Sequence, residues 1–145
     1  MGRIRDFRAD ERGALIVEFA LIVPILFFLV FGIVDFGRAY FTMNNLAAAV
    51  REGARYGAVL PSPVPAWASD SMSQRVIDFS FTFGGIPLQK SQVTSVIDPT
   101  PGVETATVTA NYTFRPITPL LRMINMDSIP MTEKAVFRWE FGGGS

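Results

Sequence analysis

The sequence predicts an α+β fold in which one long N-terminal helix crosses a membrane and packs, at its exposed half, against a small antiparallel sheet. Three observations predict it. An apolar run of 21 residues occupies positions 14–34, no helix-breaking proline follows before Pro61, and three runs with strand-like alternation lie in the C-terminal half. We therefore expect a membrane segment at 14–34, an exposed helical half at 35–60 and an external α+β part at 61–141.

Composition excludes several classes of protein. The 145 residues allow one domain, and they include 13 Lys plus Arg, 13 Asp plus Glu, and neither His nor Cys. Without His and Cys there is no Ser-His-Asp triad, no thiol nucleophile, no His or Cys metal or haem ligation and no disulfide. A net charge of zero lacks the basic excess that phosphate binding needs. We expect no enzyme activity, no cofactor, no metal and no nucleic-acid partner.

The apolar run at 14–34 contains one charge, Glu18, and one proline, Pro24. As a helix it rises roughly 31 Å, which matches the hydrocarbon core of a bilayer. A buried helix of a soluble protein usually needs only 10 to 14 apolar residues. The run therefore predicts a single membrane span, while Pro24 is compatible with either a kink or a straight helix.

The charges beside the span predict its orientation. Residues 1–13 hold four arginines, whereas Arg38 is the only basic residue between the run and Arg51. The positive-inside rule then places the N-terminus in the cytoplasm and everything after the span outside. A secretory signal peptide would have a shorter apolar region followed directly by a small-residue cleavage site, and 35–38 offers none.

The helix is expected to continue from Gly13 to Ala58, about 68 Å. Residues at spacings of three and four mark one apolar face in its outer half: Phe36, Tyr40, Met43, Leu46 or Ala47, and Val50. A second stripe holds only small residues, Ala49, Gly53 and Gly57. Such a stripe pairs helices inside membranes, but outside them it favours close approach of the protein's own sheet.

The C-terminal part is expected to be mixed. After a proline-rich linker at 60–65, helical spacing covers 66–79, and the alternation of Phe79, Phe81 and Phe83 is also compatible with an incipient strand. Strands are predicted at 92–97, 104–114 and 129–140, with a hairpin turn at 98–102 and one helical turn at 120–124. Four aromatic residues should form the sheet face that packs on the long helix, or else a binding platform: Tyr112, Phe114, Phe137 and Trp139. Residues 142–145 are typical of a flexible tail or an expression linker.

Glu18 is the anomaly of the span, because a carboxylate in the membrane costs on the order of 3 kcal/mol. It would be harmless in the headgroup region. However, positions 13–19 spell Gly, four apolar residues, Glu and an aromatic residue. This pattern resembles the processing site of type IV prepilins, whose peptidase cuts after the glycine and leaves Glu as the fifth mature residue. Glycine suits such a bond because it can adopt an extended or turned backbone outside a helix.

The resemblance extends to the TadE-like family, pilin-like proteins of the tight-adherence pilus system. It is carried by the leader ending DERG, by VEFALIVPILFFLVFGIVDFGRAYF at 17–41 and by AAAVREGARYGAV at 47–59. It implies a pilin-like architecture, a cytoplasmic leader at 1–13 cut between Gly13 and Ala14 by a prepilin peptidase, and a role of Glu18 and Phe19 in assembly and register. It also implies an inner-membrane location with the C-terminal part periplasmic, and other pilin-like subunits and the assembly platform as partners. The sequence leaves open whether the protein ends up in the filament, at its tip or in the membrane.

Two features depart from the broader type IV pilin pattern. The first mature residue would be Ala14, where major pilins often have Phe, and the chain has no C-terminal cysteine pair. Both weaken a major-pilin role, so the resemblance implies a minor pilin or pseudopilin. The alternative is an unprocessed single-pass anchor whose external domain binds a partner. A membrane-bound enzyme using external Asp and Glu is a third class, but the sequence spacing pairs none of them.

Overall fold

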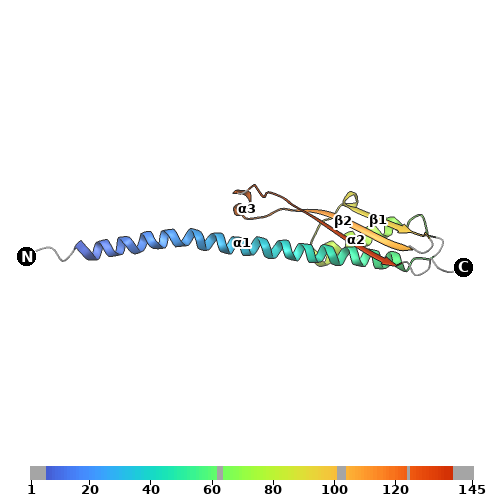
Figure 1. Cartoon of the computed structure of the whole chain (residues 1–145), viewed down its shortest axis with the longest axis horizontal. Coiled ribbons are helices and arrows are strands. Elements are labelled where there is room, and N and C mark those ends of the chain that lie inside the picture. Colours follow the sequence, from blue (N-terminus) through green and yellow to red (C-terminus); the bar gives the residue numbers. More distant parts are fainter. Residues whose placement is uncertain (1–5, 62–63, 101–103, 124, 139–145) are drawn as a thin grey trace, which may run out of the picture.

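The structure, a computed structural model, describes residues 6–61, 64–100, 104–123 and 125–138, and it confirms the predicted α+β arrangement (Figure 1). One long helix carries a second helix and a three-stranded antiparallel sheet near its C-terminal end. The elements in chain order are α1 (Asp6–Ala58), α2 (Ala68–Gly84), the 3-10 turn η1 (Lys90–Gln92), β1 (Val93–Asp98), β2 (Thr105–Phe114), α3 (Pro119–Met123) and β3 (Ile129–Arg138). We call the part formed by α2, the sheet and the end of α1 the head.

Helix α1 has 53 residues and projects far beyond the head (Figure 1). Pro24 lies inside it without interrupting it. The large apolar side chains between Leu15 and Val34, Val23 apart, are 38–69% exposed, so the chain itself does not cover this segment. Among the described residues it is the one helix long and apolar enough to cross a membrane.

Helix α2 extends five residues further than its predicted end and includes the three alternating phenylalanines. The rings of Phe79 and Phe83, one turn apart, have centroids 4.5 Å from each other. Gly85 ends the helix with φ of 60°, and its N–H donates to the carbonyl of Phe81. These phenylalanines are therefore helical, because nothing breaks the helix before the glycine pair.

The sheet has the order β1-β2-β3 with both pairs antiparallel, which confirms the predicted hairpin between β1 and β2. Ala106, Val108 and Ala110 of β2 are buried and alternate with half-buried threonines. Opposite Val108 lie Ser95 of β1 and Ala135 of β3, so these positions share the core face. The helical turn in the β2–β3 connection is α3, one residue earlier than predicted at both ends.

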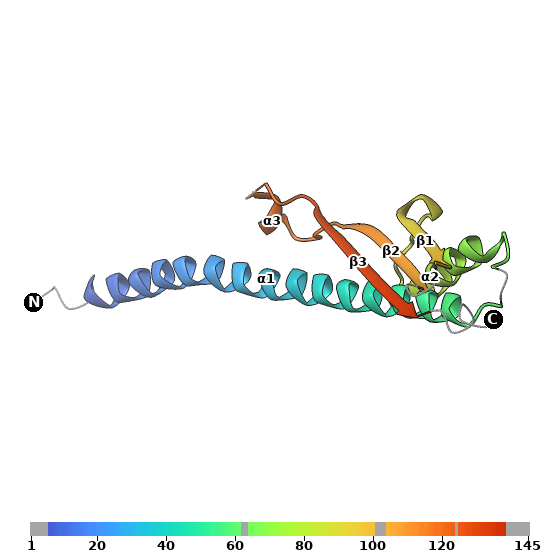
Figure 2. The ribbon, with the colours of Figure 1, turned by 45° about the vertical axis from the view of Figure 1, so that its right-hand side comes forward.

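The core lies between the last turns of α1, helix α2 and the inner face of the sheet (Figure 2). From α1 it includes Leu46, Ala49, Val50, Ala54 and Ala58; the other members are Met72, Val76, Ile86, Leu88, Val93, Ala106, Val108, Ala110 and Ala135.

The apolar face predicted on the outer half of α1 is covered only in part. Leu46 and Val50 are buried, but Phe36, Tyr40 and Met43 are 74%, 63% and 51% exposed. Along this stretch the rest of the chain contacts another side of α1, at Asp35 and Arg38, so the first part of the apolar face has no cover within the described chain. We call these three side chains the bare stripe.

The aromatic face is also only partly as predicted. Phe114 is buried and Tyr112 packs against the core, whereas Phe137 remains more than a third exposed. The position of Trp139 lies outside the described residues.

Candidate functional site

The predicted processing motif lies on the part of α1 that projects from the head. Gly13 and Ala14 are both exposed, and no atom outside the local helix backbone comes within 4 Å of the place where a Cβ on Gly13 would stand. The bond between them is therefore open to a large partner.

The backbone at this bond differs from the expectation. Gly13 lies inside α1, seven residues after its start, and not in an extended or turned segment ahead of the helix. The stretch 6–12 contains no glycine or proline and several good helix formers, so helix formation continues through the glycine. An extended scissile bond therefore requires α1 to unwind locally, which a glycine makes easier than any larger residue.

Glu18 and Phe19 follow on the same projecting stretch. Both are exposed, and Phe19 is among the most exposed apolar side chains of the span. The structure thus brings these two residues near the processing bond and keeps all four motif residues far from the head (Figure 1).

A second polar site stands where α1 leaves the apolar run, and sequence reasoning missed it. Asp35 is 1% exposed. Its carboxylate accepts hydrogen bonds from the backbone N–H of Ile117 at 3.1 Å, from the backbone N–H of Thr118 at 3.2 Å and from the Thr118 hydroxyl. We call this arrangement the Asp35 clamp, because it ties the β2–β3 connection to the long helix.

Arg38 completes the clamp one turn further along α1. Its guanidinium lies 3.7 Å from the Asp35 carboxylate and stands 5.3 Å from the ring centroid of Phe114. Burial raises the pKa of the Asp35 carboxyl, but the three hydrogen bonds and the Arg38 charge outweigh that effect, so the pKa lies below its usual 3.8. Asp35 is therefore ionised and paired at neutral pH.

One sequence signal could have pointed to the clamp. Asp35 is the first charged residue after the apolar run, and Arg38 follows at helical spacing, so a paired carboxylate at the membrane boundary was readable. Its main partners, however, are more than 80 residues away in sequence. No local pattern identifies them.

The small-residue stripe lies at the other end of α1. Ala49, Gly53 and Gly57 are all buried. A Cβ on Gly53 would stand 2.4 Å from Val76 Cγ2 and 3.1 Å from the Met72 carbonyl oxygen. The nearest neighbour of this stripe is therefore helix α2, with the sheet second: Val108 Cγ2 would lie 3.6 Å from the same Cβ.

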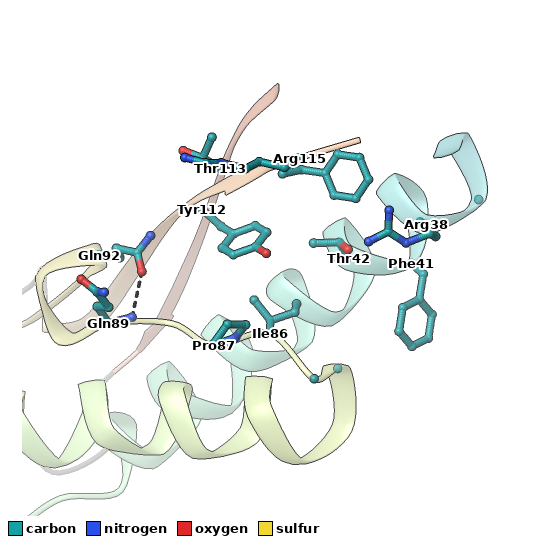
Figure 3. Close-up of a pocket in the computed structure, with 14 residues that line it drawn as sticks. Arg38, Phe41, Thr42, Ile86, Pro87, Gln89, Gln92, Tyr112, Thr113 and Arg115 are labelled. Atoms are coloured by element: carbon teal, nitrogen blue, oxygen red, sulfur yellow. Dashed lines mark hydrogen bonds between the residues drawn. The ribbon is translucent and has the colours of Figure 1, made fainter. Parts of the chain in front are cut away.

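A groove of about 970 Å³ opens between α1, the loop after α2 and the end of β2 (Figure 3). The ring of Tyr112 points from the strand toward Thr42 of α1, and Arg38 and Arg115 lie at the same end. The side-chain amide oxygen of Gln92 accepts a hydrogen bond from the backbone N–H of Gln89 at 2.8 Å on the far side of the groove. Within the described residues no cluster of three or more acidic side chains is placed to hold a metal ion.

Comparison with known proteins identifies a family over the N-terminal part of the chain. The family model described as TadE-like protein matches residues 13–55. No curated protein and no solved structure matches the chain. The matched segment begins at Gly13, includes the whole apolar run and the Asp35–Arg38 pair, and ends within the small-residue stripe. The family resemblance predicted from the sequence is therefore confirmed over residues 13–55.

Proposed function

We propose that this protein is a minor pilin or pseudopilin that takes part in assembly of a tight-adherence pilus after its leader is removed between Gly13 and Ala14. The TadE-like match associates the chain with this pilus system. The observation that carries the finer proposal is that α1 stays uncovered beyond its membrane segment, along the bare stripe of Phe36, Tyr40 and Met43.

The bare stripe distinguishes an assembling helix from a simple anchor. Full burial of one large apolar side chain contributes about 1.5–3 kcal/mol, so three exposed ones outside lipid favour an interface. Their spacing of four and three residues places them on one side of the helix, which is the arrangement that helix–helix packing uses. The same type of helix from a neighbouring subunit is a matching partner, since it presents the same face.

Glu18 supplies specificity in this proposal. Cleavage creates an ammonium group at Ala14, four residues before Glu18. A carboxylate in an apolar bundle is tolerable when a positive charge pairs with it, so Glu18 would pair with the N-terminus of a neighbouring subunit and fix the axial register. Phe19 packs beside it.

The remaining parts of the proposal concern place and partners. The chain resides in the inner membrane with its N-terminus in the cytoplasm and its head in the periplasm, and then joins the pilus. Its partners are the prepilin peptidase, other pilin-like subunits and the assembly platform. It performs no catalysis and binds no cofactor or nucleic acid.

The test is the N-terminus of the protein purified from membranes of cells with and without the peptidase. Intact mass should show loss of residues 1–13, which removes four of the 13 basic and three of the 13 acidic residues. Gly13→Val should stay uncut, because a β-branched residue stiffens the backbone that has to unwind. Gly37→Val, equally open in the structure, is the matched control and should be cut normally.

Uncut wild-type protein in cells with an active peptidase would exclude the pseudopilin. That outcome would favour the alternative, a single-pass anchor with an external partner-binding head.

A further inference from the structure

The connection between β2 and β3 does not stay with the head. It runs along α1 toward the N-terminus, so that α3 stands beside the membrane segment in both views (Figures 1 and 2). An apolar pocket of about 440 Å³ lies between them, lined by Pro24, Phe27, Phe28 and Phe31 of α1 and by Pro119 and Met123 of α3.

The depth of α3 follows from these contacts. Phe31 and Phe27 lie four and eight residues before Asp35, which is roughly 6–12 Å toward the N-terminus along the helix axis. The apolar run ends at Val34, and half of a bilayer's hydrocarbon core is about 15 Å. With the run centred in the bilayer, α3 lies within the leaflet nearest the head.

The alternative placement, with α3 in water, does not fit the length of the span. It would leave only about 13 residues, 14–26, to cross the membrane, a rise of about 20 Å against the roughly 30 Å required.

The backbone of the descending segment suits an apolar medium. Backbone donors without partners are costly in lipid. Pro116 and Pro119 have no N–H, and the two residues between them, Ile117 and Thr118, donate theirs to Asp35. None of the four consecutive backbone nitrogens at positions 116–119 therefore carries an unbonded N–H. The Thr118 hydroxyl is also bonded to Asp35.

The side chains of this segment have the same character. Ile117 and Met123 are 68% and 72% exposed, which is unfavourable in water for two large apolar groups. The exposed charges Arg115 and Asp127 stand near the two ends of the connection, at β2 and β3. One charge lies between them in sequence, Arg122.

We propose that the β2–β3 connection is a second membrane-contacting element, a finger that inserts into the leaflet nearest the head, with Ile117 and Met123 against lipid acyl chains. The Asp35 clamp fixes its depth relative to α1. The finger would make the membrane, as well as the head, determine how α1 is rotated and how far it stands out of the bilayer. This inference needs only the span, and it holds whether or not the leader is cut.

The chain has no cysteine and two tryptophans, so single-site probes are clean. We would reconstitute the full chain, with Trp67→Phe and Trp139→Phe, in phosphatidylcholine vesicles brominated on the acyl chains. Met123→Trp should be quenched about as strongly as Leu29→Trp in the span. Val136→Trp, on β3 and 51% exposed, is the matched control and should keep its emission.

A second readout uses Met123→Cys and Val136→Cys with a membrane-impermeant maleimide. Apolar surroundings raise the pKa of a thiol, and one unit lowers its thiolate fraction about tenfold. The thiol of the Met123→Cys variant should therefore react at least about tenfold more slowly in vesicles than the thiol of the Val136→Cys variant.

Two outcomes would overturn the proposal. Rapid labelling of the Met123→Cys variant, together with unquenched emission from the Met123→Trp variant, would exclude the finger. Slow labelling without quenching would exclude the lipid contact in favour of cover by a second copy of the chain.

Discussion

The two halves of the continuous helix α1 differ in the size of their side chains and in whether the rest of the chain covers them. From Leu15 to Val34 its large side chains are exposed to the surroundings, Val23 apart, whereas from Leu46 to Ala58 one side holds alanine, glycine, leucine and valine buried under the head. In the first half, large exposed apolar side chains suit contact with lipid. In the second, the absence of large side chains lets α2 and β2 approach closely: at Gly53 an added Cβ would clash with Val76 Cγ2.

The boundary between the halves is marked by one buried, hydrogen-bonded carboxylate. Asp35, fully buried, stands at the end of the apolar run and binds the β2–β3 connection, which is distant in sequence. The apolar half of α1 and the half that packs in the head are therefore coupled at one carboxylate. The predictions below test that coupling and the difference between the halves.

The largest expected effect is at Glu18. We expect Glu18→Gln and Glu18→Ala to be inserted and cut normally, since removing the charge removes a cost of about 3 kcal/mol in lipid, yet to abolish piliation in a deletion strain. The matched control is Glu52→Gln on the head half. Glu52 pairs with Arg55 at 3.0 Å and with Arg75 at 3.4 Å, both exposed arginines, and pairs of this kind contribute at most about 1 kcal/mol each. Full piliation by Glu18→Ala at normal protein levels would remove the register role.

The next effect is at Asp35. Asp35→Ala leaves two backbone donors and a hydroxyl without their acceptor, at a cost of roughly 3 kcal/mol. Amide hydrogen exchange of Ile117 and Thr118 in nanodiscs should accelerate by about 100-fold, which is the same free energy. Asp98→Ala, in an exposed turn where the carboxylate accepts only from Thr100 among the bonds described, is the control and should leave these two amides unchanged. Equal exchange in both variants would contradict a clamp.

A smaller contrast compares glycines of the two regions. Gly53→Ala should destabilise the head by about 1–2 kcal/mol, because the new methyl meets stiff Val76 and the Met72 backbone. Gly37→Ala meets nothing within 4 Å and should stabilise the helix by up to about 1 kcal/mol. Urea unfolding in detergent micelles, followed by tryptophan fluorescence, measures both. Changes in the free energy of unfolding of the same sign for Gly53→Ala and Gly37→Ala would contradict this difference.

The smallest effect is a dependence on pH. The pKa of Asp35 is lower in the folded chain than in the unfolded one, so its stabilisation is present above about pH 4 and is lost as the pH falls through the lowered folded value. Asp98, whose pKa is also lowered, by its hydrogen bonds from Thr100, contributes in the same direction. Subtracting the Asp35→Asn profile isolates Asp35: the stability difference should shrink below pH 4 and stay constant between pH 5 and 8, about the range of greatest stability for most proteins.

The sequence by itself determined what local composition and periodicity control. An apolar run of sufficient length, four arginines before it and a motif from Gly13 to Phe19 were sufficient to predict the span and the family resemblance. Alternation in β2 and the turn after β1 predicted the hairpin, because each strand's inner face follows from a period of two.

Only the tertiary structure decided which face of the outer helix is covered. The periodicity of Phe36, Tyr40 and Met43 was a genuine amphipathic signal, but the end of β2 and the β2–β3 connection meet this stretch of α1 on another side, at Asp35 and Arg38. It also decided that Gly53 is closest to α2 and that the phenylalanines at 79–83 are helical, since a short apolar run has no unique period. The Asp35 clamp was hidden for the clearest reason: its acceptor and donors lie 82 and 83 positions apart, and only folding brings them together.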